Sequence, residues 1–564
     1  MQGGAALDIN TGPSNAGAME SQPHTVVTDE MVADFVFCPR FAHLKWVQGE
    51  SADSGGADSG EAEETRASTS HWLSLTRMSW DALGVSVGIE RIEYESGESL
   101  PVRTCSVGRA EGATASASDA VALCIQGLVL RANSHLCNAG LLHCEGDGTT
   151  IRVSFDEKLL AQAYDAVFKL REMLAEPCAP IPLAGEDKCT DCAYAITCMP
   201  DEIAFMEASS RARASLDEDA SRQAEVRRLV PARDDRLPLH VQVQGAVISR
   251  KDQVVEVRVD GKTASQVRMI DLSQVCVYGN IQVTTQAIRG FCSSNIPVCY
   301  FSRGGWFYGI TQSTMGKNVL VRMAQYDVVT DPDRALSISR RFVAGKIRNC
   351  RTLLRRNCPD CDQTVLSGLS EYADRAISAD QMPSLLGIEG AAASAYFGSF
   401  GKMLSSGAEF DFKSRNRRPP KDPVNAVLSY LYSMLVKDFT VAAMAAGLDP
   451  YAGFYHQPLQ GRPALALDLM EEFRPLICDS IAIRLVNTSA LKQSDFTSMG
   501  DGVAMSDEAR RKVIAAYEAR LDSLVTHPLF GYSISYRRVL SVQAGLVKRW
   551  LLGEIDSYSP FCTR

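Results

Sequence analysis

Residues 237–261 have the sequence LPLHVQVQGAVISRKDQVVEVRVDG, in which short apolar runs are separated by Gly, Lys and Asp turns. A second stretch, QVRMIDLSQVCVYGNIQVT (266–284), has the same texture. Alternating apolar residues bounded by turn formers are typical of short β-strands. From about Asp331 the strand signals stop, and long amphipathic stretches such as NAVLSYLYSMLVKDFTVAAMAAG (425–447) predict helices. We therefore expect a small β domain over residues 237–330 and an all-helical lobe over 331–564.

Upstream of residue 237 the pattern is mixed. Strand-like runs such as VSVGIERIEYE (85–95) alternate with helical patterns such as DEKLLAQAYDAVFKLREML (156–174), which predicts a compact α/β domain over 28–204. The charged residues 205–236 predict a helical linker, and the Gly-, Ala- and Ser-rich residues 1–27 predict a disordered tail. With 564 residues, the chain is expected to be an α+β multidomain protein.

The charge of the chain is divided along its length. Residues 1–236 carry a net charge of −17 and residues 237–564 carry +8, within a total of −9. A basic half favours a polyanion such as DNA, because each neutralised phosphate releases counterions; chance partition with an acidic tail is the alternative.

No run reaches the roughly 18 apolar residues of a membrane helix, and the N-terminus lacks the features of a secretory signal. We expect a cytoplasmic protein with no membrane partner.

Acidic residues and one histidine stand out in the helical lobe. Glu389 is the only acid in the small, apolar stretch LLGIEGAAASAYFGSF (385–400). In FYHQPLQGRPALALDLMEEFRP (454–475), His456 lies on a predicted turn, and Asp468 and Glu471 share one face of the next helix. Carboxylates and an imidazole that converge from separate elements suit Mg²⁺ or Mn²⁺. Taken singly, each has a plainer explanation: a solvated glutamate, a structural histidine and a polar surface face.

Cysteines form a pattern in the acidic half. Cys189, Cys192 and Cys198 have the spacing C-x2-C-x5-C, and Cys38 lies far upstream. Four thiolates can hold a 4Fe-4S cluster or a structural Zn²⁺, and the sequence leaves both open.

The second half resembles the CRISPR Cas-one integrase family. The resemblance is carried by residues 270–310 (IDLSQVCVYG…WFYGI), 385–397 (LLGIEGAAASAYF), 415–435 (RNRRPPKDPVNAVLSYLYSML) and 454–480. It implies that Glu389, His456 and Glu471 hold the metal with Asp468 beside them. It also implies a reaction in which the 3′-hydroxyl of a prespacer attacks a CRISPR repeat boundary, and a homodimer of the integrase half bridged by a Cas-two dimer. The basic residues that would hold DNA phosphates are Arg415, Arg417, Arg418 and Lys421; a solvated loop is the alternative.

The first half is similar to the Cas-four family of RecB-like nucleases. CPRFAHLKWVQGESAD (38–53), DAVALCIQGLVLRA (119–132) and the cysteine triplet carry the similarity. It implies a 4Fe-4S cluster on Cys38, Cys189, Cys192 and Cys198, in a module that recognises prespacer ends or the PAM.

The nuclease motif of that family is altered in this chain. Glu90 stands where the family has Asp, and Arg103 and Cys105 stand at its Glu and Lys positions; the family histidine would fall near Thr69 or His71. Gln126 remains from a later motif and could contact DNA. Because neither Arg nor a neutral Cys is a suitable Mg²⁺ ligand, we expect weakened or lost nuclease activity in this half.

Two other functions stay open. One is a metal-dependent nuclease that cuts branched DNA during repair, and the other is a DNA-binding scaffold without catalysis.

Overall fold

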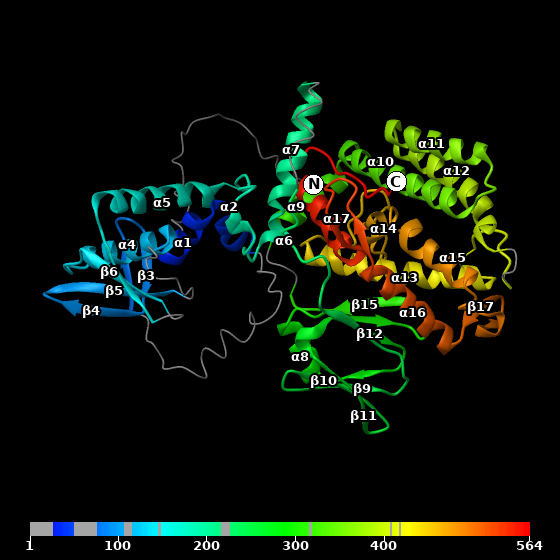
Figure 1. The fold of residues 1–564 in the computed structure, drawn as a ribbon, viewed down its shortest axis with the longest axis horizontal. Coiled ribbons are helices and arrows are strands. Elements are labelled where there is room, and N and C mark those ends of the chain that lie inside the picture. Colours follow the sequence, from blue (N-terminus) through cyan, green and yellow to red (C-terminus); the bar gives the residue numbers. More distant parts are fainter. Residues whose placement is uncertain are drawn as a thin grey trace, which may run out of the picture. The chain divides into compact units, whose positions relative to one another are not determined.

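The computed structural model describes residues 26–49, 76–105, 115–144, 148–176, 178–215, 226–314, 318–405, 409–416 and 419–563. The chain divides into two compact units (Figure 1). The first unit comprises Met1–Pro39 and Leu73–Ala175, and the second comprises Arg40–Trp72 and Glu176–Arg564. The fold is a mixed α+β architecture, as predicted.

The first unit combines two sheets with three main helices. One sheet has the order β4 (Arg91–Glu95), β5 (Glu98–Cys105), β6 (Ala139–Cys144) and β7 (Thr150–Ser154), and its β5–β6 pair is parallel. The other has the order β1 (Val27–Thr28), β3 (Val85–Ile89) and β2 (Thr76–Trp80). The helices are α1 (Asp29–Phe37), α4 (Ala117–Ala132) and α5 (Glu157–Ala175).

Helix α4 is the centre of the first unit. Every residue from Val121 to Leu130 is buried, so both faces of the helix are covered. Gly127 permits this packing, because a Cβ at its position would lie only 2.2 Å from the ring of Phe155.

The second unit contains the predicted strands in two four-stranded sheets. The first has the order β11 (Lys262–Arg268), β10 (Val254–Val259), β9 (Val247–Lys251) and β13 (Gln282–Val283). The second has the order β15 (Phe307–Thr311), β14 (Val298–Phe301), β12 (Leu272–Tyr278) and β8 (Leu237–Val241). Together with α8 (Thr285–Ser293) they enclose one apolar core that includes Ile248, Val275 and Phe291.

The remainder of the second unit is built of helices around a larger core. They are α9 (Val319–Thr330), α10 (Pro332–Asn357), α11 (Gln363–Ser378), α12 (Met382–Phe400), α13 (Pro423–Ala445), α14 (Ala464–Met470), α15 (Ser480–Asn487), α16 (Asp507–Asp522) and α17 (Tyr536–Leu551). Among the described helices, α13 alone is long and apolar enough to cross a membrane, but 67% of its apolar stretch is buried inside the structure.

The prediction of an all-helical lobe is wrong at two places. Strands β16 (Phe496–Met499) and β17 (Gly502–Met505) pair in one hairpin, and β18 (Leu524–Thr526) and β19 (Ser533–Ser535) pair in another. In the first, Gly500 has φ +56°, which a turn between paired strands requires and most other residues avoid.

The cysteine segment, residues 178–199, belongs to the second unit in this division. It contains α6 (Ala195–Cys198) and leads into α7 (Pro200–Ser215). Met199 and Ile203 are buried in the large helical core.

Candidate metal and nucleic-acid site

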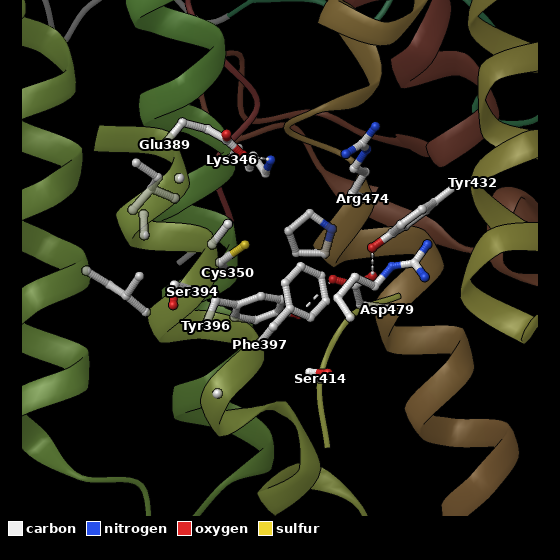
Figure 2. Close-up of a pocket in the computed structure, with 18 of the residues that line it drawn as sticks. Lys346, Cys350, Glu389, Ser394, Tyr396, Phe397, Ser414, Tyr432, Arg474 and Asp479 are labelled. Carbon is white, nitrogen blue, oxygen red and sulfur yellow. Dashed lines mark hydrogen bonds and ion pairs between the residues drawn. The ribbon is translucent and has the colours of Figure 1, made fainter. Parts of the chain in front are cut away.

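A lysine lies between two carboxylates at the centre of the helical core. Lys346 of α10 forms an ion pair with Glu389 of α12, and its Nζ lies 2.8 Å from Oε2 of Glu471, which directly follows α14. Figure 2 shows the Lys346 and Glu389 side chains meeting at one end of a pocket. The Glu471 side chain is 2% exposed and that of Glu389 is 22% exposed. Three separate elements therefore bring an ammonium group and two acids to one place.

Asp468 fixes the histidine of this site. Its carboxylate accepts the backbone N–H groups of Phe454 (2.7 Å), Tyr455 (3.0 Å) and His456 (2.8 Å), and it lies 2.7 Å from Nδ1 of His456. A carboxylate acceptor at Nδ1 favours the tautomer that carries its proton there. The other ring nitrogen, Nε2, then presents a lone pair and lies 3.8 Å from Oε1 of Glu471.

Neighbouring charges keep Glu471 ionised. Burial by itself would raise the pKa of this carboxyl, but the neighbouring Arg474, Lys346 and His456 side chains lower it to about 2. Arg474 contributes most among them, with Nη1 at 3.1 Å from Oε1 of Glu471. Lys346 responds in the opposite sense: burial would lower its pKa, but the two carboxylates raise it above its ordinary value. The site therefore holds charges of both signs on side chains that are buried or mostly buried.

The pocket beside this site has a volume of about 640 Å³ and is lined by aromatic and basic groups (Figure 2). On one wall, Tyr396 and Tyr432 donate their hydroxyl groups to Asp479, at 2.7 and 2.6 Å. The guanidinium groups of Arg415 and Arg474 lie over the Tyr432 ring, at 5.3 and 4.9 Å from its centre. Arg415 is held by Asn425 and Ser429, to which it donates at 2.7 and 3.1 Å. Aromatic rings and fixed guanidinium groups together suit a nucleotide, whose base stacks and whose phosphate accepts hydrogen bonds.

The predicted residues of the helical lobe are partly brought together. Glu389 and Glu471 both pair with Lys346, and His456, paired with Asp468, lies beside Glu471. Arg415 lines the adjoining pocket. The side chain of Lys421 is exposed, while its backbone N–H donates to Asn416. Arg417 and Arg418 lie outside the described residues. In the part of the chain that the structure describes, no three His, Cys, Asp or Glu side chains are already arranged as metal ligands.

Sequence reasoning missed Lys346 and Arg474. Lys346 is one basic residue among many in α10, but it follows buried Phe342 and Val343 and precedes buried Ile347. A lysine on the apolar face of an amphipathic helix needs a compensating charge, and this was the available signal.

The first unit has its own acidic cluster, around Asp29. Asp29 is 6% exposed and accepts a hydrogen bond from Nε2 of Gln126 at 2.7 Å. Arg103 lies 3.3 Å from Asp29 and 3.7 Å from Asp119. Burial raises the pKa of the Asp29 carboxyl, while Gln126 and Arg103 oppose the rise. Sequence reasoning missed Asp29, because an acid in the first turn of a helix usually only stabilises the N-terminus of that helix.

The other predicted residues of the first unit have different contacts. Glu90 accepts a hydrogen bond from Thr104 at 2.6 Å. The Sγ atoms of Cys105 and Cys144, on neighbouring strands, lie 2.9 Å apart. Thr69 and His71 lie outside the described residues.

The four predicted cluster ligands are divided between the units. Cys38 belongs to the first unit, and Cys189, Cys192 and Cys198 belong to the second, where all three are partly exposed. Arg40 lies beside the triplet: burial would lower its pKa, but Glu554 and Cys198 raise it.

Comparisons with known proteins identify the family to which the chain belongs. The family model described as "CRISPR associated protein Cas1" matches residues 239–519. The "CRISPR-associated exonuclease Cas4/endonuclease Cas1 fusion" of Geobacter sulfurreducens is 38% identical, over 95% of this chain and 98% of that protein. A solved "Casposase bound to integration product" has a TM-score of 0.52 at 22% identity and covers 58% of this chain and 93% of its own. A "Cas6-RT-Cas1--Cas2 complex" chain has a TM-score of 0.51 at 21% identity, covering 84% of this chain and 50% of that one. These two likenesses concern the fold. Because the fusion relative matches nearly end to end, the chain belongs to the Cas4/Cas1 fusion family of CRISPR-associated nucleases.

Proposed function

We propose that this protein integrates prespacer DNA into the CRISPR array at a divalent-metal site formed by Glu389, His456 and Glu471. The observation that carries the proposal is the imidazole of His456, which Asp468 orients so that Nε2 faces Glu471. Two carboxylates and one imidazole are a donor set that Mg²⁺ and Mn²⁺ accept. Lys346 lies between the two carboxylates and pairs with both, so their negative charges are already balanced by a cation in this structure.

A bound Mg²⁺ or Mn²⁺ would polarise the target phosphodiester and favour the ionised form of the attacking hydroxyl. The residues of the chain have other tasks. Asp468 holds His456 in one tautomer, and Arg474 keeps Glu471 ionised. Arg415, fixed by Asn425 and Ser429, is placed to bind a phosphate of the DNA.

The reaction is a transesterification. The 3′-oxygen of the prespacer forms a bond to the phosphorus at the repeat boundary, and the bond from that phosphorus to the 3′-oxygen of the neighbouring nucleotide breaks. The proton lost by the attacking hydroxyl is balanced by the one that the leaving oxygen gains. One P–O bond replaces another, so the step needs no nucleoside triphosphate.

We further propose that the first unit and the cysteine segment form a module that binds prespacer ends or the PAM. Three partly exposed thiols in one short segment, with the buried guanidinium of Arg40 near Cys198, fit a 4Fe-4S cluster, because thiolate-bound clusters carry negative charge. Cys38 would supply the fourth thiolate, and a structural Zn²⁺ is the alternative. The domain boundaries at 28–204, 205–236, 237–330 and 331–564 stay a prediction.

The nuclease site of that module is proposed to be inactive. Arg103 lies between Asp29 and Asp119, so a fixed guanidinium takes the place that a cation between two acids would have. Glu90, the predicted counterpart of the family's aspartate, instead binds Thr104.

The partners that we propose are prespacer and repeat DNA, a Cas2-type dimer and a second copy of the integrase half, in the cytoplasm. The family resemblance and the net charge of +8 over residues 237–564 support this assignment.

An integration assay tests the proposal. Full-length protein is combined with its Cas2 partner, a prespacer with 3′ overhangs and a repeat-bearing plasmid, in the wild type and in the His456→Ala and Glu90→Ala variants. We expect integration to be lost only with His456→Ala, with the overhangs untrimmed throughout. Metal-dependent trimming that disappears with Glu90→Ala would show a working nuclease in the first unit. Cleavage of branched DNA without any need for a repeat would favour the repair nuclease, and wild-type DNA binding without either reaction would favour the scaffold.

A further inference from the structure

The chain does not end at α17 but returns along the back of the candidate metal site. We name residues 552–563 the C-terminal tail. Glu472, next to Glu471, is fully buried and faces this tail. Its carboxylate accepts hydrogen bonds from Tyr558 Oη (2.5 Å), the backbone N–H of Phe561 (2.9 Å) and Gln543 Nε2 (3.1 Å). Glu472 thus has three donors, two of them from the tail.

The tail is also bonded to the helix that carries Lys346. Asn349, one turn further along α10, donates to the backbone carbonyls of Glu472 (2.8 Å) and Phe561 (2.7 Å). The N–H of Thr563 donates back to Asn349 Oδ1 at 3.1 Å. The fit is close, because a Cβ at Gly345 would lie 2.7 Å from Cβ of Pro560. The tail therefore fixes both elements that place charged groups in the site.

The other end of the tail is anchored at the cysteine segment. Glu554 accepts from Arg549 Nη1 at 2.9 and 3.1 Å and forms an ion pair with Arg40. Arg549 also donates to the carbonyl of Thr197, and Arg40 donates to that of Pro180 at 2.7 Å. Both arginine side chains are almost completely buried, at 0% and 1% exposed. Pairs of this kind hold their elements firmly, since breaking one leaves a buried charge uncompensated.

We propose that the C-terminal tail positions Glu471 for metal binding and that Tyr558, acting through Glu472, is the positioning residue. Glu471 and Glu472 are consecutive, so anchoring the Glu472 side chain restricts rotation of the backbone that aims Glu471 at Lys346 and His456. Groups behind a metal ligand set its orientation in this way. Because Glu554 anchors the same tail, the cysteine segment and the metal site are parts of one hydrogen-bonded assembly. The inference rests on the proposed metal site.

The test measures the affinity of the full-length protein for added Mn²⁺ by electron paramagnetic resonance. Tyr558→Phe removes one hydroxyl that donates to a buried carboxylate. The matched control is Tyr517→Phe, since the Tyr517 hydroxyl donates to the buried Asp438 at 2.7 Å, away from the metal site. We expect Tyr558→Phe to weaken Mn²⁺ binding roughly 10-fold, the lower end of what a lost outer-shell partner costs, and Tyr517→Phe to leave it unchanged. Equal affinities in the two variants would overturn the inference.

A second variant tests the anchor. Glu554→Gln keeps the size of the side chain and removes the charge that pairs with Arg40 and Arg549. We expect faster hydrogen exchange of the 556–563 amides together with weaker Mn²⁺ binding. Faster exchange with unchanged Mn²⁺ affinity would show that the tail does not position the site. If the wild type binds no Mn²⁺, or if His456→Ala binds it equally well, the proposed function itself fails.

Discussion

Both units place a cationic side chain between two carboxylates, but the cation is an arginine in the first unit and a lysine in the second. In the first unit, the guanidinium of Arg103 lies between Asp29 and Asp119. In the second, the ammonium of Lys346 lies between Glu389 and Glu471. Arginine is charged at any pH that the protein meets, and its planar fork holds its partners in place. Lysine is a single charged group on a flexible stem that can turn away.

The second difference is the imidazole. His456, the proposed metal ligand, adds an imidazole beside Glu471 of the Lys346 cluster. Around Asp29, by contrast, the additional group is the amide of Gln126, which donates a hydrogen bond to the carboxylate. The comparison therefore predicts metal chemistry in the helical lobe and structural charge pairing in the first unit.

The largest effect should follow removal of the imidazole. We expect His456→Ala to lower the integration rate roughly 10³-fold, comparable with the loss of other groups that stabilise charge in a transition state. The measurement is strand transfer into a repeat-bearing plasmid. The matched control is His143→Ala, because the half-buried His143 lies in β6 of the first unit and its ring hydrogen-bonds Thr150. A fall of the same size in the control would remove the distinction between the units.

A smaller effect should follow a change at Asp468, the carboxylate that orients the imidazole of His456. Asp468→Asn keeps the shape of the side chain but weakens acceptance from His456 Nδ1 and from three backbone N–H groups. We expect metal affinity and integration to fall about 10- to 100-fold. Titration of activity against Mn²⁺ concentration separates the two effects. If high Mn²⁺ does not restore any activity, Asp468 has a task beyond orienting the histidine.

In the first unit, loss of the cation should affect stability. Arg103→Gln leaves Asp29 buried without its ion-pair partner, and we expect the free energy of unfolding to fall by about 1–3 kcal/mol. Calorimetry of the full chain measures the change. The exposed pair Arg91–Glu93 provides the control, because Arg91→Gln should alter stability by less than about 0.5 kcal/mol. A first unit that gains stability on losing Arg103 would contradict the structural assignment.

The last effect appears only as a change with pH, and it concerns a buried carboxylate that pairs with no cation among the described residues. Glu202 accepts from the Tyr532 hydroxyl at 2.9 Å, and burial raises its pKa from 4.5 to about 7, with Asp201 adding to the rise. Below pH 4.5 the group is protonated in both states. Between pH 4.5 and 7 the unfolded chain loses this proton while the folded chain keeps it, so stability falls as the pH rises and then levels off.

In the wild type, the free energy of unfolding should fall by at most about 3 kcal/mol between pH 4.5 and 7 because of Glu202. We expect Glu202→Gln to remove this fall. Urea unfolding at pH 4.5, 6 and 7.5 measures it. An unchanged slope would mean that Glu202 is ionised in the folded protein, as Glu471 is, although no cation pairs with it in the part of the chain that the structure describes.

Much of this architecture follows from local patterns in the sequence. The alternation at 237–261 and the amphipathic stretches after Asp331 predict their strands and helices, because burial of one face has a fixed period in each. The grouping of His456, Asp468 and Glu471 was also predictable, since they lie within 16 residues across one turn and one helix.

The partners that complete each site were not predictable. Lys346 meets Glu389 across 43 residues, and Tyr558 meets Glu472 across 86. Such pairings depend on which helix faces meet in three dimensions, and no single-chain periodicity records this. The two hairpins were missed for a related reason: strands of three or four residues are shorter than the window over which alternation can be recognised.

The division into units is not a single cut along the chain. The polypeptide passes from the first unit to the second after Pro39, returns after Trp72 and leaves again after Ala175. A protease that cleaved only at Ala175–Glu176 would therefore leave Arg40 on the N-terminal fragment and its partner Glu554 on the other. We expect the two fragments to elute together. A gene that begins at Glu176 would lack Arg40, so Glu554 would lose one of its ion-pair partners. Deletion studies of the integrase half should keep residues 40–49 or replace the charge that Arg40 supplies.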